Sequence, residues 1–231
     1  MKFAGEIASK SNDAVKQFSK LLKRSAYRRE MGQYALEGAR LCSDAAKSGV
    51  SIVTAFVTKK SLEKYDIYIS DIEKSGAPVY IISEQVAGFI GDTTNTQGVF
   101  CICQMQIMAE NELSFESSDI CIALENIQDP ANMGTILRTA EAFGVDKIIV
   151  SSNSCDVYNP KVLRGSMGGI FRLAVYHTDD MPRTVERLER RGIACHALVV
   201  DDAPVESHHA LYTSCSTSCC LNRKMLYFHP Y

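Results

Sequence analysis

The stretch LENIQDPANMGTILRTAEAFG, residues 124–144, decides the fold. Its first residue ends the hydrophobic run Asp119–Leu124, and a polar turn containing Asp129 follows. Apolar residues then recur every three or four positions, which is the spacing of a helix that buries one face. The pattern predicts a strand, a turn and a helix over Asn132–Phe143, with Asn132 capping the helix.

Two residues in this helix suggest binding chemistry. Gly134 lets the helix begin close to another backbone or to a ligand. Arg138 lies off the apolar stripe, and an arginine one turn into a helix beside a strand end can bind a phosphate bidentately. On spacing alone, an ordinary strand–helix turn with a surface arginine remains the simpler interpretation.

The same alternation of strand and helix continues to about residue 200. It predicts parallel βαβ units, in which ligands bind beyond the carboxyl ends of the strands. The predicted strands are Asp119–Leu124, Lys147–Val150, Phe171–Tyr176 and Ile193–Val200, and the predicted helices are Asn132–Phe143, Lys161–Met167 and Pro182–Arg191.

The first hundred residues predict a separate, smaller α/β domain. Val15, Phe18, Leu21 and Leu22 have helical spacing, with lysine and arginine on the other side. Ser83 is placed to cap a short helix. The predicted strands are Gln33–Leu36, Ser51–Thr58, Pro78–Ile82 and Gly98–Ile107, and the longer helices are Glu37–Ala46 and Ser61–Ser75.

Charge is distributed unevenly along the chain. Residues 1–31 contain eight lysines and arginines against three acidic residues, although the net charge of the whole chain is −2. This excess suits a polyanion such as RNA, with Arg28 and Arg29 as candidate contacts, but a solvated helix face is the alternative.

Composition favours a cytoplasmic protein. Hydrophobic residues make up 46% of the sequence, no stretch is long and apolar enough to span a bilayer, and the N-terminus lacks the apolar core of a secretory signal. Four of the nine cysteines lie inside apolar runs and are expected to be reduced core residues: Cys101, Cys103, Cys121 and Cys195.

The exact residues of the deciding stretch resemble the first signature motif of SpoU-type RNA methyltransferases, whose catalytic domain has the SPOUT trefoil-knot fold. A second family motif resembles IIVSSNSCDVYNPKVLRGSMGGIFRL, residues 148–173. Glu37-Gly38 and Gln97-Gly98 resemble the ribosomal-protein-like substrate domain of many members. The matching motif positions are Asn132, Gly134, Arg138, Thr139, Asn159, Lys161, Arg164, Ser166 and Gly168.

This resemblance implies methyl transfer from S-adenosylmethionine to a ribose 2′-hydroxyl of RNA, with rRNA as the expected class. It implies catalytic roles for Arg138 and Asn132. A guanidinium is not readily deprotonated, so Arg138 is expected to hold a phosphate and favour the developing alkoxide rather than act as the base. A homodimer is also expected. The resemblance further implies RNA-binding positions at Glu125, Asn126, Lys161 and Arg164.

The sequence departs from the family after Val200. A Gly-Asn-Glu-Gly loop, an Ile-Pro-Met stretch and a Ser-Leu-Asn stretch, which supply most contacts to the methyl donor, have no counterpart. Val200 and Asp201 are then the expected edge of the donor pocket. Either a frameshift or alternative splice replaced the true ending, or the chain is a real product that binds RNA without methylating it. The tail's cysteines and histidines fit no compact zinc-ligand spacing.

These observations predict an α/β fold with two domains: an RNA substrate-binding domain at 1–107 and a parallel-sheet SPOUT domain at 119–205, truncated before the knot. Residues 108–118 are the predicted linker, and 206–231 are predicted to be an aberrant tail without regular structure. The leading function is RNA 2′-O-ribose methylation, and the alternative is a non-catalytic RNA-binding protein of the same family. An unrelated nucleotide-binding enzyme ranks low, since no glycine-rich phosphate loop follows any strand.

Overall fold

A computed structural model describes residues 3–93, 95–106, 108–109, 112–114, 119–199 and 224–229 of the chain. Contacts divide the chain into two compact units. Unit 1 comprises Met1–Met105 and Tyr158–Phe171, and unit 2 comprises Gln106–Val157 and Arg172–Tyr231. Residues 158–171 of the second signature segment therefore belong by their contacts to the same unit as the N-terminal residues, and the rest of that segment belongs to unit 2.

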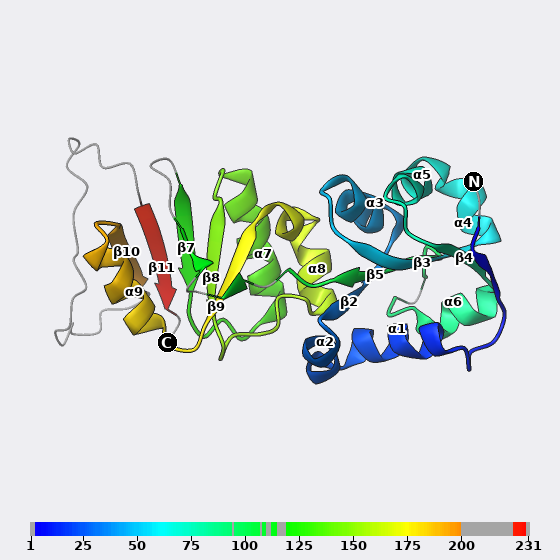
Figure 1. The fold of residues 1–231 in the computed structure, drawn as a ribbon, viewed down its shortest axis with the longest axis horizontal. Helices are drawn as coiled ribbons and strands as arrows, with labels where there is room; N and C mark the ends of the chain where they lie inside the picture. The colour runs from blue at the N-terminus through cyan, green and yellow to red at the C-terminus, as the bar shows by residue number, and fades with distance from the viewer. Residues whose placement is uncertain are drawn as a thin grey trace. The chain divides into compact units, whose positions relative to one another are not determined.

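Unit 1 is built on a five-stranded mixed sheet in the order β1-β4-β3-β5-β2. Strands β1, β4 and β3 are parallel, while β5 is antiparallel to both β3 and β2. Helices α3 and α5 cover one face and α1 and α6 the other (Figure 1). The strands are β1 (Gly5–Ile7), β2 (Gln33–Glu37), β3 (Ile52–Thr58), β4 (Val79–Ile82) and β5 (Val99–Gln104). The helices are α1 (Asp13–Lys23), α2 (Ser25–Met31), α3 (Ala39–Lys47), α4 (Lys59–Lys64), α5 (Asp66–Lys74), α6 (Glu84–Ile90) and α8 (Pro160–Ser166).

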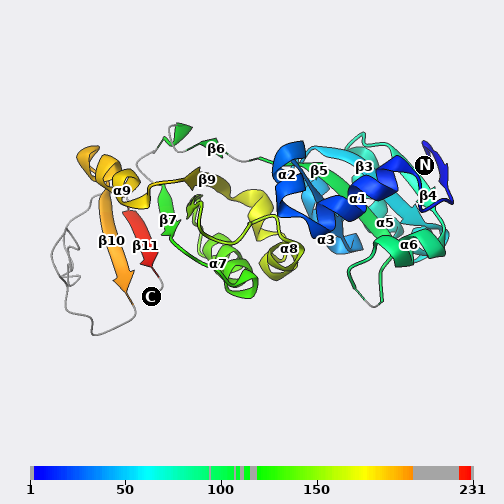
Figure 2. The same cartoon turned by 90° about the horizontal axis from the view of Figure 1, so that it is seen from below.

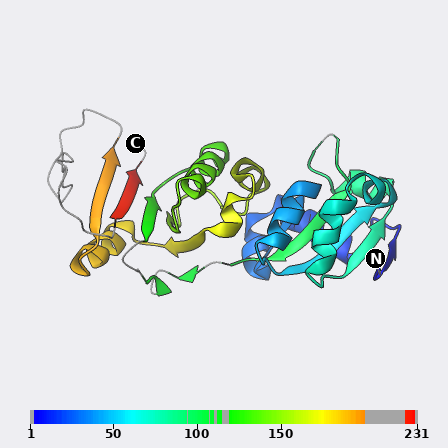
Figure 3. The same ribbon diagram turned by 90° about the horizontal axis from the view of Figure 1, so that it is seen from above.

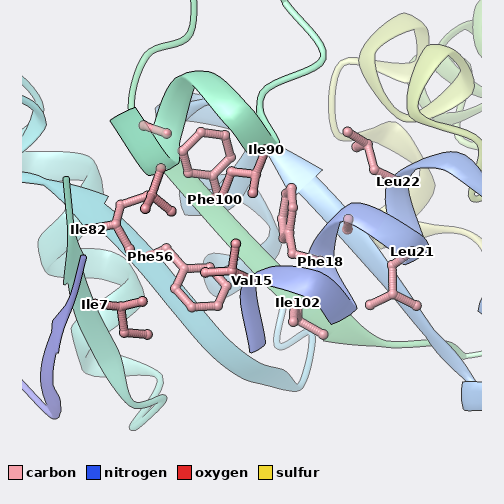
Figure 4. Close-up of a cluster of buried hydrophobic side chains, with 13 residues drawn as sticks. Ile7, Val15, Phe18, Leu21, Leu22, Phe56, Ile82, Ile90, Phe100 and Ile102 are labelled. Atoms are coloured by element: carbon pink, nitrogen blue, oxygen red, sulfur yellow. The ribbon is translucent and has the colours of Figure 1, made fainter. Parts of the chain in front are cut away.

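The apolar stripe predicted for the first helix forms the centre of one core of unit 1. The ring of Phe18 meets Phe56 and Phe100 edge-on, at centroid distances of 6.1 and 5.4 Å. Figure 4 shows these rings packed with side chains from α1, α6 and the sheet. The other stripe residues, Val15, Leu21 and Leu22, are buried with them, which confirms the predicted face.

Three predicted boundaries in this half are wrong. The helix expected over 61–75 is two helices, because Tyr65 leaves the helical conformation with φ −126° and ψ 30°. The strand expected over 98–107 ends at Gln104. The segment expected as a linker, 108–118, contains the short strand β6 (Met108–Ala109), which pairs with a strand of unit 2.

Unit 2 contains a six-stranded sheet in the order β10-β11-β7-β8-β9-β6, with every neighbouring pair parallel. Figures 2 and 3 both show β11 lying between β10 and β7. The strands after β6 are β7 (Ile120–Leu124), β8 (Lys147–Ser151), β9 (Ala174–Thr178), β10 (Ala194–Val199) and β11 (Lys224–His229). The helices are α7 (Pro130–Ala142) and α9 (Met181–Arg190).

Strand β11 corrects the expectation that 206–231 lacks regular structure. Its residues, KMLYFH, contain a short apolar run, as is typical of a strand enclosed between two parallel neighbours. Residues 206–223 and 230–231 lie outside the described residues. The strand expected over 171–176 begins instead at Ala174, because Gly169–Arg172 form a turn of 3-10 helix.

The core of unit 2 follows the alternation of the strands. Cys121 and Ala123 of β7 face a cluster that includes Met181 and Leu188 of α9. Ile122 and Leu124 are also buried and alternate to the other face of the sheet. Within the described part of the chain, no helix is long and apolar enough to cross a membrane.

Candidate functional site

Hydrogen bonds join the turns that follow the carboxyl ends of β7 and β8, and residues 126–127 and 151–155 are called the platform below. The backbone N–H of Asn126 donates to the Ser151 hydroxyl at 2.9 Å, and the N–H of Ile127 donates to the Ser154 hydroxyl at 3.1 Å. The N–H of Cys155 donates to the Ile127 carbonyl oxygen at 2.8 Å. This is the edge of a parallel sheet at which ligands bind.

Asn126 adopts a left-handed conformation, with φ +55°. Asparagine tolerates this region better than other residues with a side chain. Its side-chain oxygen accepts from Gln128 Nε2 at 2.8 Å, which fixes the turn after β7. Glu125 and Asn126 are both half-buried at this edge, so a structural role in the turn accounts for at least part of their presence.

Helix α7 begins at Pro130, two residues earlier than predicted, and its cap differs from the expectation. Asp129, not Asn132, is the N-cap, since its carboxylate accepts from the N–H groups of Ala131 and Asn132 at 2.6 and 2.9 Å. Pro130 occupies the first helical position, where its fixed φ suits the helix. Asn132 is therefore an exposed first-turn residue whose side chain is not used for capping.

The two predicted catalytic residues are both exposed on α7, and Gly134 between them is buried. Arg138 lies six residues after Asn132, which is roughly 9 Å along a helix axis and about 240° around it. Asn132 and Arg138 consequently leave the helix in different directions. The helix itself does not bring them together, and a ligand between them would have to extend along it.

The predicted RNA-binding residues of the second motif lie on α8, in unit 1. Asn159 caps this helix by accepting from Lys161 N–H at 2.9 Å, and Lys161 is exposed. Arg164 Nη2 lies 2.9 Å from a carboxylate oxygen of Asp92, and the two side chains are 36% and 43% exposed. Asp92 was not among the candidates identified from sequence.

Arg28 is a wrong candidate for RNA contact. It is 3% exposed, and its Nη1 donates to the carbonyl oxygens of Leu21 and Leu22 at 2.7 and 3.3 Å. These carbonyls lie in the last turn of α1, where helical partners are missing. Arg28 therefore fastens the end of α1, whereas Arg29 is exposed and remains a candidate.

A thiol and a histidine near this edge are poorly suited to nucleophilic or base chemistry. Burial raises the pKa of Cys155 to about 11, so the thiol stays protonated at neutral pH. Burial lowers the pKa of His177, which favours its neutral form. Among the described residues there is no cluster of three side chains suited to a metal ion. The expected donor-pocket edge, Val200 and Asp201, lies outside the described residues.

Sequence reasoning also missed a cavity of about 320 Å³ in unit 1. It is bounded by the first turns of α3, by Thr93, Asn95 and Gln97, and by the end of α8. The only signals were the Glu37-Gly38 and Gln97-Gly98 pairs. Gln97 Oε1 accepts from Ala39 N–H at 2.8 Å, so the two pairs meet at this cavity.

Comparison with known families agrees with this architecture. Residues 119–222 match the SpoU rRNA methylase family, and residues 12–101 match the MRM3-like substrate binding domain. An uncharacterized tRNA/rRNA methyltransferase of Synechocystis sp. is 30% identical over 193 residues, which cover 84% of this chain and 69% of that protein.

The chain belongs to the SpoU rRNA methylase family. Members of this family are S-adenosylmethionine-dependent RNA methyltransferases.

Two further members relate this chain to a named activity and a solved fold. The 23S rRNA (guanosine(2553)-2′-O)-methyltransferase of Bacillus subtilis is 26% identical over 85% of this chain and 74% of its own length. The structure of an AdoMet-bound rRNA methyltransferase from Sinorhizobium meliloti superposes with a TM-score of 0.76 over 97% of this chain and 80% of that one, at 24% identity. The predicted SPOUT-type α/β fold is thereby confirmed.

Proposed function

We propose that this SpoU-family chain methylates a ribose 2′-hydroxyl of rRNA, using S-adenosylmethionine. The observation that carries the proposal is the platform at the ends of β7 and β8, from which α7 presents Arg138 and Asn132 to solvent. The relative from Bacillus subtilis, similar over both halves of the chain, is named for the same reaction on 23S rRNA.

Arg138 is proposed to act electrostatically on the reacting ribose. S-adenosylmethionine, when bound, supplies an electrophilic methyl group. Loss of the ribose proton to water leaves negative charge on the 2′-oxygen, and a guanidinium beside it stabilises that charge while also holding the adjoining phosphate. Asn132, whose side chain is not used as the helix cap, can donate to another part of the RNA that lies along α7.

RNA is also proposed to contact basic side chains of unit 1. Arg29 and Lys161 are exposed, and Arg164 is half-exposed. Such side chains bind phosphates without reading sequence, which fixes the position of the RNA. Glu125 and Asn126 shape the turn against which the target nucleotide would lie.

The test is transfer of tritiated methyl groups from S-adenosylmethionine to in vitro transcribed bacterial rRNA, which carries no prior modification. We expect incorporation that leaves the modified phosphodiester resistant to alkali, because a methylated 2′-oxygen cannot attack the adjoining phosphate. RNA binding without incorporation would instead support the non-catalytic alternative. An affinity independent of salt, or no affinity, would contradict both, since phosphate contacts release counterions.

A homodimer in the cytoplasm is the proposed working form. Phe143, at the end of α7, is 80% exposed and is the candidate for the subunit contact. The buried cysteines Cys42, Cys101, Cys103 and Cys121 are free thiols, as expected in a reducing compartment. Fluorescence microscopy of the tagged protein in its native cell tests the location.

A further inference from the structure

The cavity of unit 1 is large enough to hold part of a ligand. Its volume of about 320 Å³ lies at the lower end of the range for small-molecule sites, roughly 300–1,000 Å³. Half-buried Leu41 on α3 and Met167 at the end of α8 supply apolar surface. The exposed carboxamides of Asn95 and Gln97 supply polar edges.

Met167 is the C-cap residue of α8, and its backbone N–H donates to the Arg164 carbonyl oxygen at 3.2 Å. It has φ +50° and ψ 37°, a left-handed conformation that is costly for a residue with a bulky side chain, and it is 53% exposed. A left-handed residue is a common way to end a helix. Here it holds a flexible apolar side chain at the rim of the cavity instead of in a core.

The charged side chains around the cavity are all engaged with partners, and their charges sum to −1. Both carboxylate oxygens of Glu37 are occupied, one by Asp92 N–H at 2.7 Å and the other by the Thr93 hydroxyl at 2.6 Å. Arg40 Nε lies 3.9 Å from Asp44, and Arg164 is paired with Asp92. A cavity with apolar walls, amide edges and little net charge suits an uncharged planar group better than a phosphate.

We propose that this cavity holds one unpaired base of the substrate RNA, while Arg164 exchanges Asp92 for the phosphate next to that base. The inference rests on the proposed function and assigns it a specific contact in the substrate domain. Unpaired bases are recognised by stacking on side chains and by hydrogen bonds to their edges. The half-exposed ion pair is weak enough for a phosphate to replace its carboxylate.

The test measures binding of fluorescein-labelled 12-nucleotide single-stranded RNAs of mixed sequence by fluorescence anisotropy, using the full chain. Asn95→Ala removes an exposed carboxamide at the cavity and is expected to weaken binding about fivefold. Gln85→Ala removes an equally exposed carboxamide on α6, away from the cavity, and is the matched control with less than a twofold effect. Leu41→Trp, which fills the cavity, is expected to weaken binding about tenfold or more.

Two readouts separate the base from the phosphate. Neither neutral change should alter the slope of log affinity against log salt, because no phosphate contact is lost. Asp92→Asn frees Arg164 and is expected to strengthen binding about threefold at low salt, with a steeper slope. Photo-crosslinking of RNA containing 4-thiouridine, mapped by mass spectrometry, should label Leu41, Asn95 or Met167.

The inference is overturned if Asn95→Ala, Leu41→Trp and Asp92→Asn all bind RNA like the unsubstituted chain and the crosslinks map to other residues. In that case, if these variants still bind RNA and transfer methyl groups, the proposed function is not contradicted. Adenosine monophosphate binding as tightly as the 12-mer would assign the cavity to a free nucleotide and also overturn the inference. A chain that binds no RNA at all refutes both proposals together.

Discussion

Arg138 is the residue on which the proposed chemistry depends most. Two substitutions distinguish the contribution of its positive charge from that of its planar guanidinium group. Arg138→Ala should lower methyl transfer by about 10²–10³-fold, as expected for loss of one group that stabilises a developing oxyanion. Arg138→Lys should recover only part of this loss, since a lysine keeps the charge but cannot bind a phosphate bidentately.

Measurement of initial rates with saturating RNA and donor checks this prediction. Because Arg138 is exposed, the melting temperature of both variants should match that of the unsubstituted chain. A rate for Arg138→Ala within threefold of the unsubstituted value would refute the role assigned to this residue.

Gly98 is a position where one added methyl group should affect stability. It has φ +70°, and a Cβ atom there would lie 2.6 Å from Thr58 Oγ1, the atom that accepts from Ser61 N–H in the cap of α4. Gly98→Ala should destabilise the chain by about 2 kcal/mol or more, because backbone strain adds to displacement of the cap.

Gly49→Ala provides the matched control for this prediction. Gly49 has φ +76° with no atom within 4 Å of the added Cβ, so it tests backbone strain without the steric contact. Urea unfolding should show a smaller loss for Gly49→Ala, about 1 kcal/mol. Equal losses at the two positions would show that Thr58 yields without cost.

At the scale of elements, the start of α7 depends on its Asp129 cap. Asp129→Ala should cost about 1 kcal/mol of unfolding free energy, since two N–H groups lose their acceptor. Asp129→Asn should restore most of it, because asparagine is an equally good N-cap. Chemical denaturation measures both, and an unfolding free energy of Asp129→Ala equal to that of the unsubstituted chain would mean that the cap contributes nothing.

The contact between α3 and α5 should make stability depend on pH. Asp71 accepts from the Ser43 hydroxyl at 2.7 Å and lies 2.9 Å from Lys47 Nζ, and these contacts lower its pKa. A depressed folded-state pKa gives stability that is present above the ordinary value of 3.8 and is lost as pH falls through the folded pKa.

Denaturation of Asp71→Asn between pH 6 and pH 2 checks this direction. The unsubstituted chain should lose more unfolding free energy below about pH 4 than the variant, which has no carboxylate to protonate at this position. Parallel losses in the two proteins would contradict the prediction.

At the scale of the whole molecule, the prediction concerns assembly. Phe143 is 80% exposed in the single chain and would be buried in the proposed dimer. Phe143→Ser removes the phenyl ring from that contact and should therefore shift the protein from dimer to monomer. Light scattering after gel filtration measures the mass. Ile67→Ser, which alters a 71% exposed apolar residue in unit 1, is the control and should leave the mass unchanged.

Local patterns in the sequence were enough to determine the strand–turn–helix of residues 124–144, the buried stripe of α1 and membership of the SpoU family. Each depends on residues close together in the chain, where apolar spacing and motif order carry the information.

Tertiary structure alone decided three other features. Arg28 is buried and donates to two carbonyl oxygens of α1, seven and six residues earlier in the chain, so it is not an RNA contact. Strand β11 has a defined place only because β10 and β7 lie on either side of it. The cavity forms where α3, Asn95, Gln97 and α8 lie together, and no local sequence pattern predicts contact between segments so far apart in the chain.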